Sequence, residues 1–368
     1  MAKTIGIAMI GVGAISGIYL ENITKVFKEI KLIGVCDLIR ERAENAQKKY
    51  NVPKLYETMH DAFADPEVDL VLNITRPYEH FEVSKAALLA GKHVYCEKPL
   101  GATFEEGVEL VRLAQEKGLY LGGAPDTFMG AGIQTARKVI DEGAIGTPIG
   151  AVAAMTCHGH ESWHPDPEFY YKFGGGPMLD MGPYYITALV NLMGGVSEVS
   201  GVAKKSFPTR TITSQPHYGE VVDVDVDTYV TGTLMFDNGA VGTIFTTFDI
   251  YGGDGCRIDI YGTEGTLSVP DPNGFGGPVK LLKNGEWTEI SIDGFDYAQN
   301  SRALGLADMA KSIADGRKSR CDYTQTEHVL EIMTMIGKSS EEGRRIKLTT
   351  HYERGIPMVK PEVKGILD

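Results

Sequence analysis

Two glycines near the start of the chain have the spacing of a nucleotide-binding turn. Gly11 and Gly13 directly follow the apolar run 5–10 and precede a segment with helical periodicity at about 15–27. Gly11 allows a tight turn, Gly13 lets the backbone approach a pyrophosphate, and the helix start offers unpaired N–H groups to the anion. Ser16 stands where the usual pattern has a third glycine, and its small side chain still allows close packing of helix and strand.

An acidic residue completes this pattern at the end of the next apolar run, KLIGVCD. Asp37 lies there, where a ribose-binding carboxylate is expected about 20 residues after the glycine turn. Such a carboxylate binds the adenosine ribose diol and repels a 2′-phosphate, so the sequence predicts NAD in preference to NADP. The alternative is an ordinary strand-to-helix turn in which Asp37 caps the helix.

Two further motifs contain side chains that could move protons. The segment CEKPLG at 96–101 follows an apolar run and contains Lys98. The segment GGGPMLDMGPYY at 174–185 contains Asp180 and Tyr184, whose spacing of four places them on one face of a helix. Spacing alone does not interpret CEKPLG, because a lone lysine is usually a solvated surface residue.

Together with GVGAIS near the start, these motifs resemble the glucose-fructose oxidoreductase and inositol dehydrogenase family, often called Gfo/Idh/MocA. The resemblance covers nearly the whole chain, because the order of the motifs and the two-part pattern of elements both match. It implies an N-terminal Rossmann domain that binds NAD or NADP, and oxidation or reduction of a secondary alcohol of a sugar, inositol or related polyol. It also implies dimers or tetramers formed through an open sheet of the C-terminal domain.

The resemblance assigns a role to Lys98. In the family this lysine ends a strand of the cofactor domain and contacts both the nicotinamide ribose and the substrate hydroxyl. A partly buried ammonium group there would stabilise a developing alkoxide while hydride leaves the carbon. Glu97 would hold this lysine or the cofactor, and Pro99 would fix the direction of the chain after the strand.

The chain departs from the family pattern at the third motif. Family members usually have His four residues after the Asp, whereas this chain has Asp180 and Tyr184. Tyr occurs there in the glucose-fructose oxidoreductase and dihydrodiol dehydrogenase branches, and a phenol can act as the base once nearby charge lowers its pKa from about 10. Asp180 would orient the substrate or the tyrosine. In the alternative interpretation Asp180 caps a helix, Tyr184 is a half-buried core aromatic and Pro183 kinks the segment.

Histidines and aromatic residues are concentrated just before and within this motif. His158, His160 and His164 lie within seven residues, but no HExxH or CxxC spacing accompanies them, so we expect no metal. His164 is the best candidate among them for a substitute acid/base or substrate ligand. The aromatic residues suit either a pocket for a ring-shaped polyol or packing between the domains; they are Trp163, Phe169, Tyr170, Tyr171, Phe173, Tyr184 and Tyr185.

These observations give three sets of expected site residues. The catalytic set is Lys98, Asp180, Tyr184 and His164. The substrate-binding set is Lys98, Asp126, His160, Trp163, His164, Asp180 and Tyr184. The cofactor-binding set is Gly11, Gly13, Ala14, Ile15, Asp37, Arg42, Thr75, Arg76, His80, Glu97 and Lys98. Thr75 and Arg76 stand where the family commonly has Thr-Pro, and the sequence suggests no role for Arg76.

Two patterns of elements must position these residues. Over residues 1–125, short apolar runs alternate with helix-period segments, which predicts an α/β, doubly wound Rossmann domain that binds NAD. Over 126–368, β-branched and aromatic strands are separated by turns such as DNG, GTEG and KNG, with two helices near 301–315 and 324–342. This half is predicted to be an α+β substrate-binding and oligomerisation domain with a large, open, mostly antiparallel sheet. A sheet face left free by helices favours a homodimer or a dimer of dimers.

Composition excludes several classes of partner. The 36 Lys and Arg against 49 Asp and Glu give a net charge of −13, which disfavours nucleic acid and membrane surfaces. No run approaches the roughly 18 apolar residues of a bilayer-spanning helix. The cysteines are odd in number and widely spaced, which fits reduced thiols in the cytoplasm; they are Cys36, Cys96, Cys157, Cys256 and Cys321.

The sequence therefore predicts a cytoplasmic NAD-dependent oxidoreductase acting on a secondary ring hydroxyl of a sugar, glycoside or cyclitol. The most specific form of this hypothesis is oxidation at position 3 of a glycoside ring. Two alternatives remain open. One is an NAD-dependent glycosidase that uses transient ring oxidation, and the other is a non-catalytic cofactor- or sugar-binding regulator on the same fold.

Overall fold

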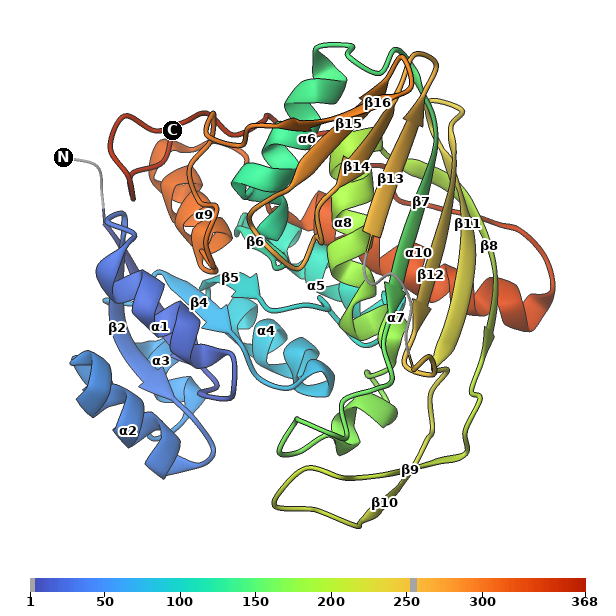
Figure 1. Cartoon of the computed structure of the whole chain (residues 1–368). Helices are drawn as coiled ribbons and strands as arrows, with labels where there is room; N and C mark the ends of the chain where they lie inside the picture. The colour runs from blue at the N-terminus through green and yellow to red at the C-terminus, as the bar shows by residue number, and fades with distance from the viewer. Residues whose placement is uncertain (1–3, 252–256) are drawn as a thin grey trace.

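Short strands and helices alternate in the first third of the chain, as the sequence predicts. The computed structural model describes residues 4–251 and 257–368 (Figure 1). Six parallel strands form one sheet in the order β3-β2-β1-β4-β5-β6, and the central strands β1 and β4 are buried along their whole length. They are β1 (Ile5–Ile10), β2 (Ile30–Cys36), β3 (Lys54–Leu55), β4 (Leu70–Asn73), β5 (His93–Cys96) and β6 (Leu121–Gly123).

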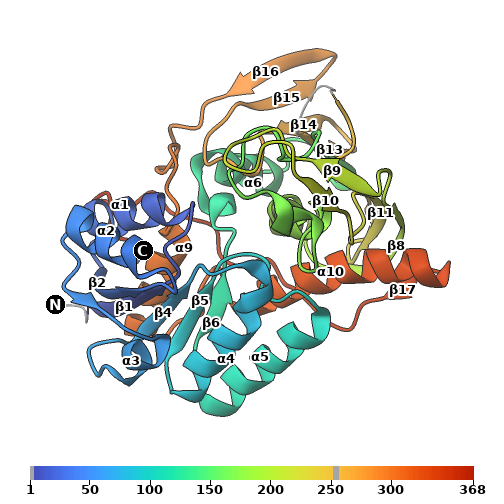
Figure 2. The same ribbon diagram turned by 90° about the horizontal axis from the view of Figure 1, so that it is seen from below.

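Helices cover both faces of this sheet. Figure 2 shows α1 (Ser16–Lys25) and α2 (Arg40–Tyr50) on one face, with α3 (Met59–Ala64), α4 (His80–Leu89) and α5 (Phe104–Lys117) on the other. The strand order reverses between β1 and β4, and dinucleotides bind beyond the carboxyl ends of the strands at such a switch point. The predicted doubly wound Rossmann architecture is therefore confirmed, and its binding edge is located.

A second, larger sheet follows. Its nine strands have the order β16-β15-β14-β13-β7-β12-β11-β8-β17, and every neighbouring pair is antiparallel except β7 with β12. The prediction of a mostly antiparallel sheet is confirmed. The strands are β7 (Pro148–Thr156), β8 (Val196–Lys204), β11 (Tyr229–Phe236), β12 (Val241–Thr247), β13 (Arg257–Gly262), β14 (Thr266–Val269), β15 (Val279–Lys283), β16 (Glu286–Ile290) and β17 (Ile346–Lys347).

One face of the second sheet is covered by helices. Figure 1 shows α6 (Ala131–Asp141), α8 (Gly182–Met193) and α10 (Tyr323–Glu342) along that face, while α9 (Leu304–Asp315) lies nearer the first sheet. Every residue of α8 is buried, as expected for a helix that is apolar on all sides. On β12, buried and more exposed positions alternate along most of the strand, so the opposite face of the sheet is open.

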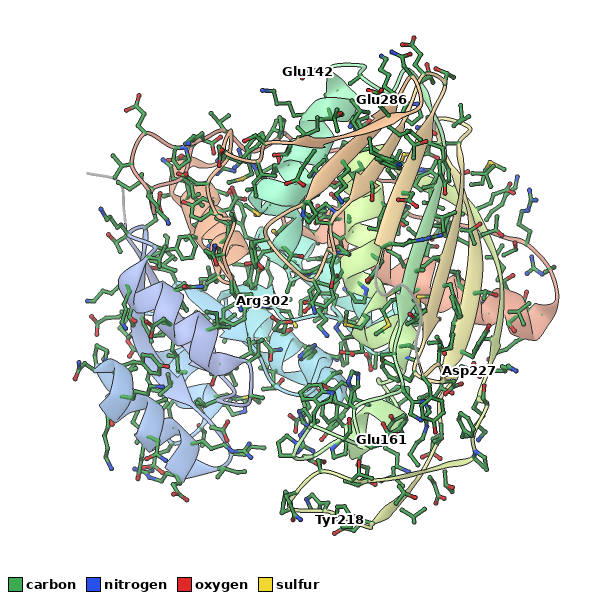
Figure 3. The ribbon with its side chains drawn as sticks, viewed as in Figure 1. Glu142, Glu161, Tyr218, Asp227, Glu286 and Arg302 are labelled. Atoms are coloured by element: carbon green, nitrogen blue, oxygen red, sulfur yellow. The ribbon has the colours of Figure 1, made fainter. Side chains whose placement is uncertain are left out.

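Between β8 and β11 the chain makes an excursion that the sequence did not predict. It contains β9 (Thr209–Thr211) and β10 (Val221–Asp223), which form a two-stranded antiparallel ribbon. Figure 3 shows Tyr218 at the far tip of this excursion. Because β9 and β10 have only three residues each, they carry too little periodicity to be recognised as strands.

The last third of the chain returns to the first sheet. Gly122 of β6 forms an isolated β-bridge with Asp322, and the backbone N–H of Leu367 donates a hydrogen bond to Glu29 at 2.6 Å. Gly122 has no side chain to obstruct this approach, since a Cβ there would lie 1.9 Å from the carbonyl oxygen of Cys321. The segment beyond α8 therefore contacts both sheets.

Two paired glycines let α10 pack closely on the second sheet. Gly201 of β8 and Gly232 of β11 are register partners, and Ile336 of α10 lies over both. A Cβ added at Gly201 would lie 2.6 Å from Ile336 Cγ2 and 2.7 Å from the Thr231 carbonyl oxygen. The helix cannot sit at this height above the sheet if either glycine gains a side chain.

We expect Gly201→Ala to lower the free energy of unfolding by about 2 kcal/mol, because the added methyl group overpacks against backbone atoms that cannot move independently. Urea denaturation followed by circular dichroism measures this change. Gly337→Ala is the matched control on α10, since a Cβ there meets nothing within 4 Å. Alanine at Gly337 should be neutral or stabilise by up to about 1 kcal/mol; equal stability of the two variants would contradict the packing argument.

Candidate active site

The glycine turn has the geometry that a bound pyrophosphate requires. Gly11 has a φ of +95°, and a Cβ there would lie 2.7 Å from the Ile74 carbonyl oxygen. A Cβ at Gly13 would meet nothing within 4 Å, so the space in front of it is open. Among the described residues, none accepts a hydrogen bond from the backbone N–H groups of Gly13, Ala14 or Ile15, which are exposed at the start of α1. These donors fit an anion at the helix N-terminus.

Asp37 lies directly beside this turn. Its Oδ2 accepts a hydrogen bond from the Val12 N–H at 2.6 Å, and its Oδ1 accepts one from the Ile39 N–H at 2.7 Å. These bonds fix the carboxylate at the end of β2 while each oxygen keeps a lone pair for a ribose hydroxyl. Arg42 lies on α2 with its side chain exposed. The residues of this edge therefore fit NAD, whose adenosine half would contact Asp37.

An ion pair between the two halves of the chain lies at the centre of the site. Lys98 Nζ, just beyond β5, lies 2.8 Å from Asp180 Oδ1 and also donates to the Asp180 carbonyl oxygen at 2.7 Å. Each side chain is only 16% exposed. Burial alone would lower the pKa of Lys98, but Asp180, Tyr184 and Glu97 together outweigh burial and raise it. Burial would likewise raise the pKa of Asp180, yet Lys98 and His160 hold it well below its usual range.

Tyr184 lies on the other side of the lysine. Its ring centroid is 5.2 Å from Lys98 Nζ, and the residue is 7% exposed. Asp180 is the last residue of α7 (Pro177–Asp180), whereas Tyr184 lies in the first turn of α8. The expectation that both lie on one continuous helix is therefore wrong, because Met181 separates the two helices. Pro183 is the second residue of α8 and does not kink a longer helix, because a proline without an N–H is tolerated in the first turn.

The histidine nearest the ion pair is His160, not His164. His160 Nε2 lies 3.4 Å from Asp180 Oδ2, so Lys98 and His160 lie at the two carboxylate oxygens. His164 is turned toward its own loop, where Nδ1 accepts a hydrogen bond from the Asp166 N–H at 3.0 Å. Burial lowers the pKa of His164. His160 therefore lies next to Asp180, although the sequence assigned this histidine only to substrate binding.

The loop that carries His160 is held by a buried cluster of charges. Glu161 Oε1 lies 3.1 Å from Arg210 on β9, and Arg210 also contacts Asp249 at 2.5 Å. Tyr171 donates to the other oxygen of Glu161 at 2.5 Å. Glu161 belongs to the loop after β7, and Figure 3 shows it near the excursion whose tip carries Tyr218. The β9–β10 ribbon therefore fixes the loop from which His160 reaches the ion pair.

The aromatic residues around this loop divide into two groups. Tyr171 and Tyr185 are fully buried, whereas Trp163 is 61% and Phe173 59% exposed. Trp163 contacts the His160 ring edge-on, with centroids 5.4 Å apart. Some of these rings therefore pack in the core, whereas a polyol pocket formed by the exposed ones stays a prediction. Among the described residues, no three His, Cys, Asp or Glu side chains come together as metal ligands.

The loop after β4 supports the site in three ways. Thr75 Oγ1 donates to Asn73 at 2.7 Å, and the buried ring of His80 has Nδ1 2.7 Å from the Pro99 carbonyl oxygen and Nε2 3.1 Å from that of Thr75. His80 thus joins this loop to the one that follows Lys98. Arg76 forms an ion pair with Asp166 at 2.8 Å, which links the cofactor half to the His160 loop.

Behind Lys98 lies a buried acidic group that the sequence identified only in part. Glu97 accepts a hydrogen bond from Tyr19 at 2.6 Å and one from the Lys98 N–H at 3.0 Å. Asp126, which is 1% exposed, accepts from the Gly305 N–H at 3.0 Å. Burial raises the pKa of Asp126 to about 6. The charge of Arg302, which lies just before α9, acts on this group, and no motif indicated either Tyr19 or Arg302.

Two stretches of the chain match models of known protein families. Residues 5–123 match the family model described as "Oxidoreductase family, NAD-binding Rossmann fold", and residues 133–268 match the "GFO/IDH/MocA C-terminal domain". The chain belongs to the Gfo/Idh/MocA family. Its resemblance to this family, expected from three motifs, is thereby confirmed, and it is an NAD-dependent oxidoreductase of the sugar and cyclitol dehydrogenase type.

Several Gfo/Idh/MocA proteins are similar over most of the chain. A myo-inositol 2-dehydrogenase of Thermotoga maritima is 28% identical over 71% of this chain and 74% of its own length. A levoglucosan dehydrogenase of Pseudarthrobacter phenanthrenivorans is 27% identical over 75% of this chain and 79% of its own. The solved structure of a levoglucosan dehydrogenase with NADH and levoglucosan has the same fold, with a TM-score of 0.80 at 21% identity over 94% and 100% of the two chains.

Two further sequence expectations concern the cysteines and membrane-spanning helices of this Gfo/Idh/MocA protein. The side chains of Cys36, Cys96 and Cys321 are free thiols, and Cys256 lies outside the described residues. Within the described ranges, no helix combines the length and apolar character needed to cross a bilayer.

The raised pKa of Asp126 predicts a measurable pH dependence of stability. A folded-state pKa of about 6, above the ordinary value near 4, means that the folded chain holds this proton more tightly than the unfolded chain. Stability should therefore fall as the pH rises from about 4 to 6. Relative to wild type, Asp126→Asn should gain up to about 3 kcal/mol across this window. Thermal unfolding at a series of pH values measures the difference; the exposed Asp293→Asn serves as control, and parallel curves for all three proteins would contradict the assignment.

Proposed function

We propose that this enzyme transfers hydride between NAD and a secondary ring hydroxyl of a sugar, glycoside or cyclitol. The observation that carries the proposal is the convergence of the Lys98–Asp180 ion pair and the Tyr184 phenol beyond the carboxyl ends of the first sheet. Ligands of open α/β sheets bind at this edge. The names of the curated relatives, an inositol and an anhydrosugar dehydrogenase among them, support the same class of substrate.

The residues divide the chemistry between them. NAD, when bound, accepts hydride from the carbinol carbon. The Lys98 ammonium stabilises the negative charge that develops on the substrate oxygen, and Asp180 keeps that ammonium charged inside the protein. Tyr184, as phenolate, takes the hydroxyl proton; in the reverse direction the neutral phenol returns it. His160 keeps Asp180 directed toward Lys98 from the opposite oxygen.

The environment of Tyr184 sets the pH dependence of the two directions. Burial raises the pKa of Tyr184, while Lys98 and Arg302 act to lower it. The free enzyme therefore holds a neutral phenol at neutral pH, which is the form that protonates a ketone. Oxidation of the alcohol needs the phenolate, so its rate should increase with pH through the neutral and alkaline range.

Substrate, assembly and compartment are the finer parts of the proposal. We propose a pyranoside ring, oxidised at its 3-position, against the exposed faces of Trp163 and Phe173, because aromatic faces pack against the C–H surface of sugar rings. The open face of the second sheet would form a homodimer or a dimer of dimers. The free thiols of Cys36, Cys96 and Cys321 fit a reducing compartment such as the cytoplasm.

A panel of sugars, inositols and glycosides watched for NADH formation tests the function. The expected result is NADH production in step with one ring ketone, located by product analysis. Release of the aglycone would favour the NAD-dependent glycosidase, in which ring oxidation acidifies a neighbouring C–H bond. NAD and sugar binding without any turnover would favour a regulator and contradict the proposal.

Lys98→Met should abolish hydride transfer while leaving NADH binding within about threefold of wild type. The methionine keeps the length of the side chain but leaves the developing alkoxide without a positive charge, a loss of at least about a hundredfold in kcat. Stopped-flow absorbance of NADH and fluorescence titration measure the two quantities. Lys318→Met, at a lysine 64% exposed, is the control. Turnover close to wild type in Lys98→Met would overturn the assignment.

Asp37→Ser should weaken the preference for NAD over NADP. The change removes a carboxylate that hydrogen-bonds a ribose diol and repels a 2′-phosphate, so the ratio of kcat/KM for the two cofactors should fall at least tenfold. Steady-state kinetics with each cofactor measure this ratio. Asp37→Asn separates charge from hydrogen bonding, because the amide can keep the bond to Val12. A wild type that prefers NADP would refute this role for Asp37.

A further inference from the structure

Arg76, which stands where the family commonly has a proline, has no part in the chemistry described above. Its backbone N–H donates to Glu79 Oε2 at 3.3 Å, and its Nη1 donates to the Tyr78 hydroxyl at 2.9 Å. Its Nη2 donates to Asp166 Oδ2 at 2.8 Å. Because a guanidinium holds its donors in a rigid fork, the bond to Tyr78 keeps the other arm directed at Asp166.

The strand order places Arg76 in the middle of the cofactor-binding edge. The glycine turn follows β1, Arg76 lies three residues after the end of β4, and Lys98 lies two residues after the end of β5. In the sheet, β4 lies between β1 and β5 and is parallel to both. A dinucleotide that reaches from the glycine turn to Lys98 therefore passes the loop that carries Arg76.

The other partner, Asp166, belongs to the His160 loop, which comprises residues 157–176 between β7 and α7. The second half of the chain holds the start of this loop, since the N–H groups of Thr213 and Ser214 donate to the Glu161 carbonyl oxygen at 2.9 and 2.8 Å. Figure 1 shows the loop in green between α4 and the β9–β10 ribbon. Among the ion pairs of residues 4–251 and 257–368, that of Arg76 with Asp166 joins this loop to the first half.

The end of the same loop also lies against the first half. A Cβ added at Gly174 would be 3.5 Å from Ala102 Cβ and 3.6 Å from the Tyr78 backbone nitrogen, which is ordinary van der Waals contact. Tyr78 lies in the loop after β4, and Ala102 lies in the segment that follows Lys98. The His160 loop therefore contacts both first-half segments that flank the middle of the cofactor-binding edge.

We propose that the Arg76–Asp166 ion pair is a latch that holds the His160 loop closed over the bound dinucleotide and slows its release. Arg76 is then a positioning residue that acts through Asp166 and the loop, a role that differs from the direct cofactor binding expected from the sequence. The two side chains are 49% and 46% exposed, and ion pairs this exposed are weak. A weak pair suits a latch, because it has to break each time the cofactor leaves.

The rate at which NADH leaves the protein tests the latch. Arg76→Met and Asp166→Asn should each raise the NADH dissociation rate about two- to fivefold, which is the range that an exposed ion pair supports. The double variant should release NADH no faster than either single variant, because both changes remove the same interaction. Stopped-flow displacement of NADH by excess NAD, followed by NADH fluorescence, measures these rates.

Lys172→Met is the matched control, since Lys172 lies in the same loop but forms its ion pair, at 2.9 Å, with Asp225 of the second half. Its NADH dissociation rate should equal that of wild type. If Arg76 instead binds the cofactor phosphates directly, Asp166→Asn would free the arginine and slow release while Arg76→Met accelerates it. Opposite effects of these two variants, or no effect of either, would overturn the proposal.

An exchange of charges tests the pairing itself. Arg76→Asp places two carboxylates against each other and should accelerate NADH release more than Arg76→Met does. Adding Asp166→Arg restores a pair of opposite charges, and the rate should return to within about twofold of wild type. A doubly exchanged protein that releases NADH as fast as Arg76→Asp would contradict the pairing.

A last measurement needs neither cofactor nor substrate. The chain has two tryptophans, Trp163 in the His160 loop and Trp287 on β16, so Trp287→Phe leaves Trp163 as the single reporter. In that background Arg76→Met and Asp166→Asn should both lower the fluorescence anisotropy of Trp163, because the loop moves more freely. Unchanged anisotropy in both variants would refute the action of Arg76 on the loop. The latch requires NAD binding but no particular substrate, so inactivity toward the sugar panel would leave these results unaffected.

Discussion

The ion pair between Lys98 and Asp180 is the constraint on which the rest of the site depends. It joins the end of a Rossmann strand to a short helix of the second half, 82 residues further along the chain, and both side chains are largely buried. Removing two charges from water costs several kcal/mol per ion, and this cost is offset only by good geometry and additional hydrogen bonds. The second bond from Lys98 to the Asp180 carbonyl and the proximity of His160 supply these here. The pair therefore supplies the charged group of the site and also holds the two halves of the chain in position relative to each other.

The parts of the site that could be predicted from the sequence are those set by local geometry. Gly11, Gly13 and Asp37 lie within one strand–helix–strand unit, so their spacing alone brings them together. The placement of Lys98 and Asp180 in one site came from family resemblance, because no local rule links residues so far apart, and their ion pair was not predicted. The continuous helix expected through Asp180 and Tyr184 was wrong, although the same two side chains still converge on Lys98 from two separate helices.

The remaining residues could not be predicted because irregular segments position them. His160 and His164 have the same residue type in one loop, and only the path of that loop, fixed by the buried Glu161–Arg210 pair, decides which reaches Asp180. Arg302 precedes a helix without any motif, and it is held in part by a hydrogen bond from Asn22 of α1, 280 residues earlier in the chain. Tertiary packing, which leaves no period in the sequence, controls both cases.

The return of the chain to β6 has a consequence for how the molecule is assembled. β6 is the last strand of the first sheet, and an uncovered last strand offers its free backbone groups to any other extended chain. The bridge from Gly122 to Asp322 occupies part of that margin, and α10 packs beside it. The edge of the nucleotide-binding half is consequently protected against edge-to-edge aggregation by residues about two hundred positions further along the chain. The two halves are thus interdependent for solubility as well as for chemistry, and neither is a freely exchangeable module.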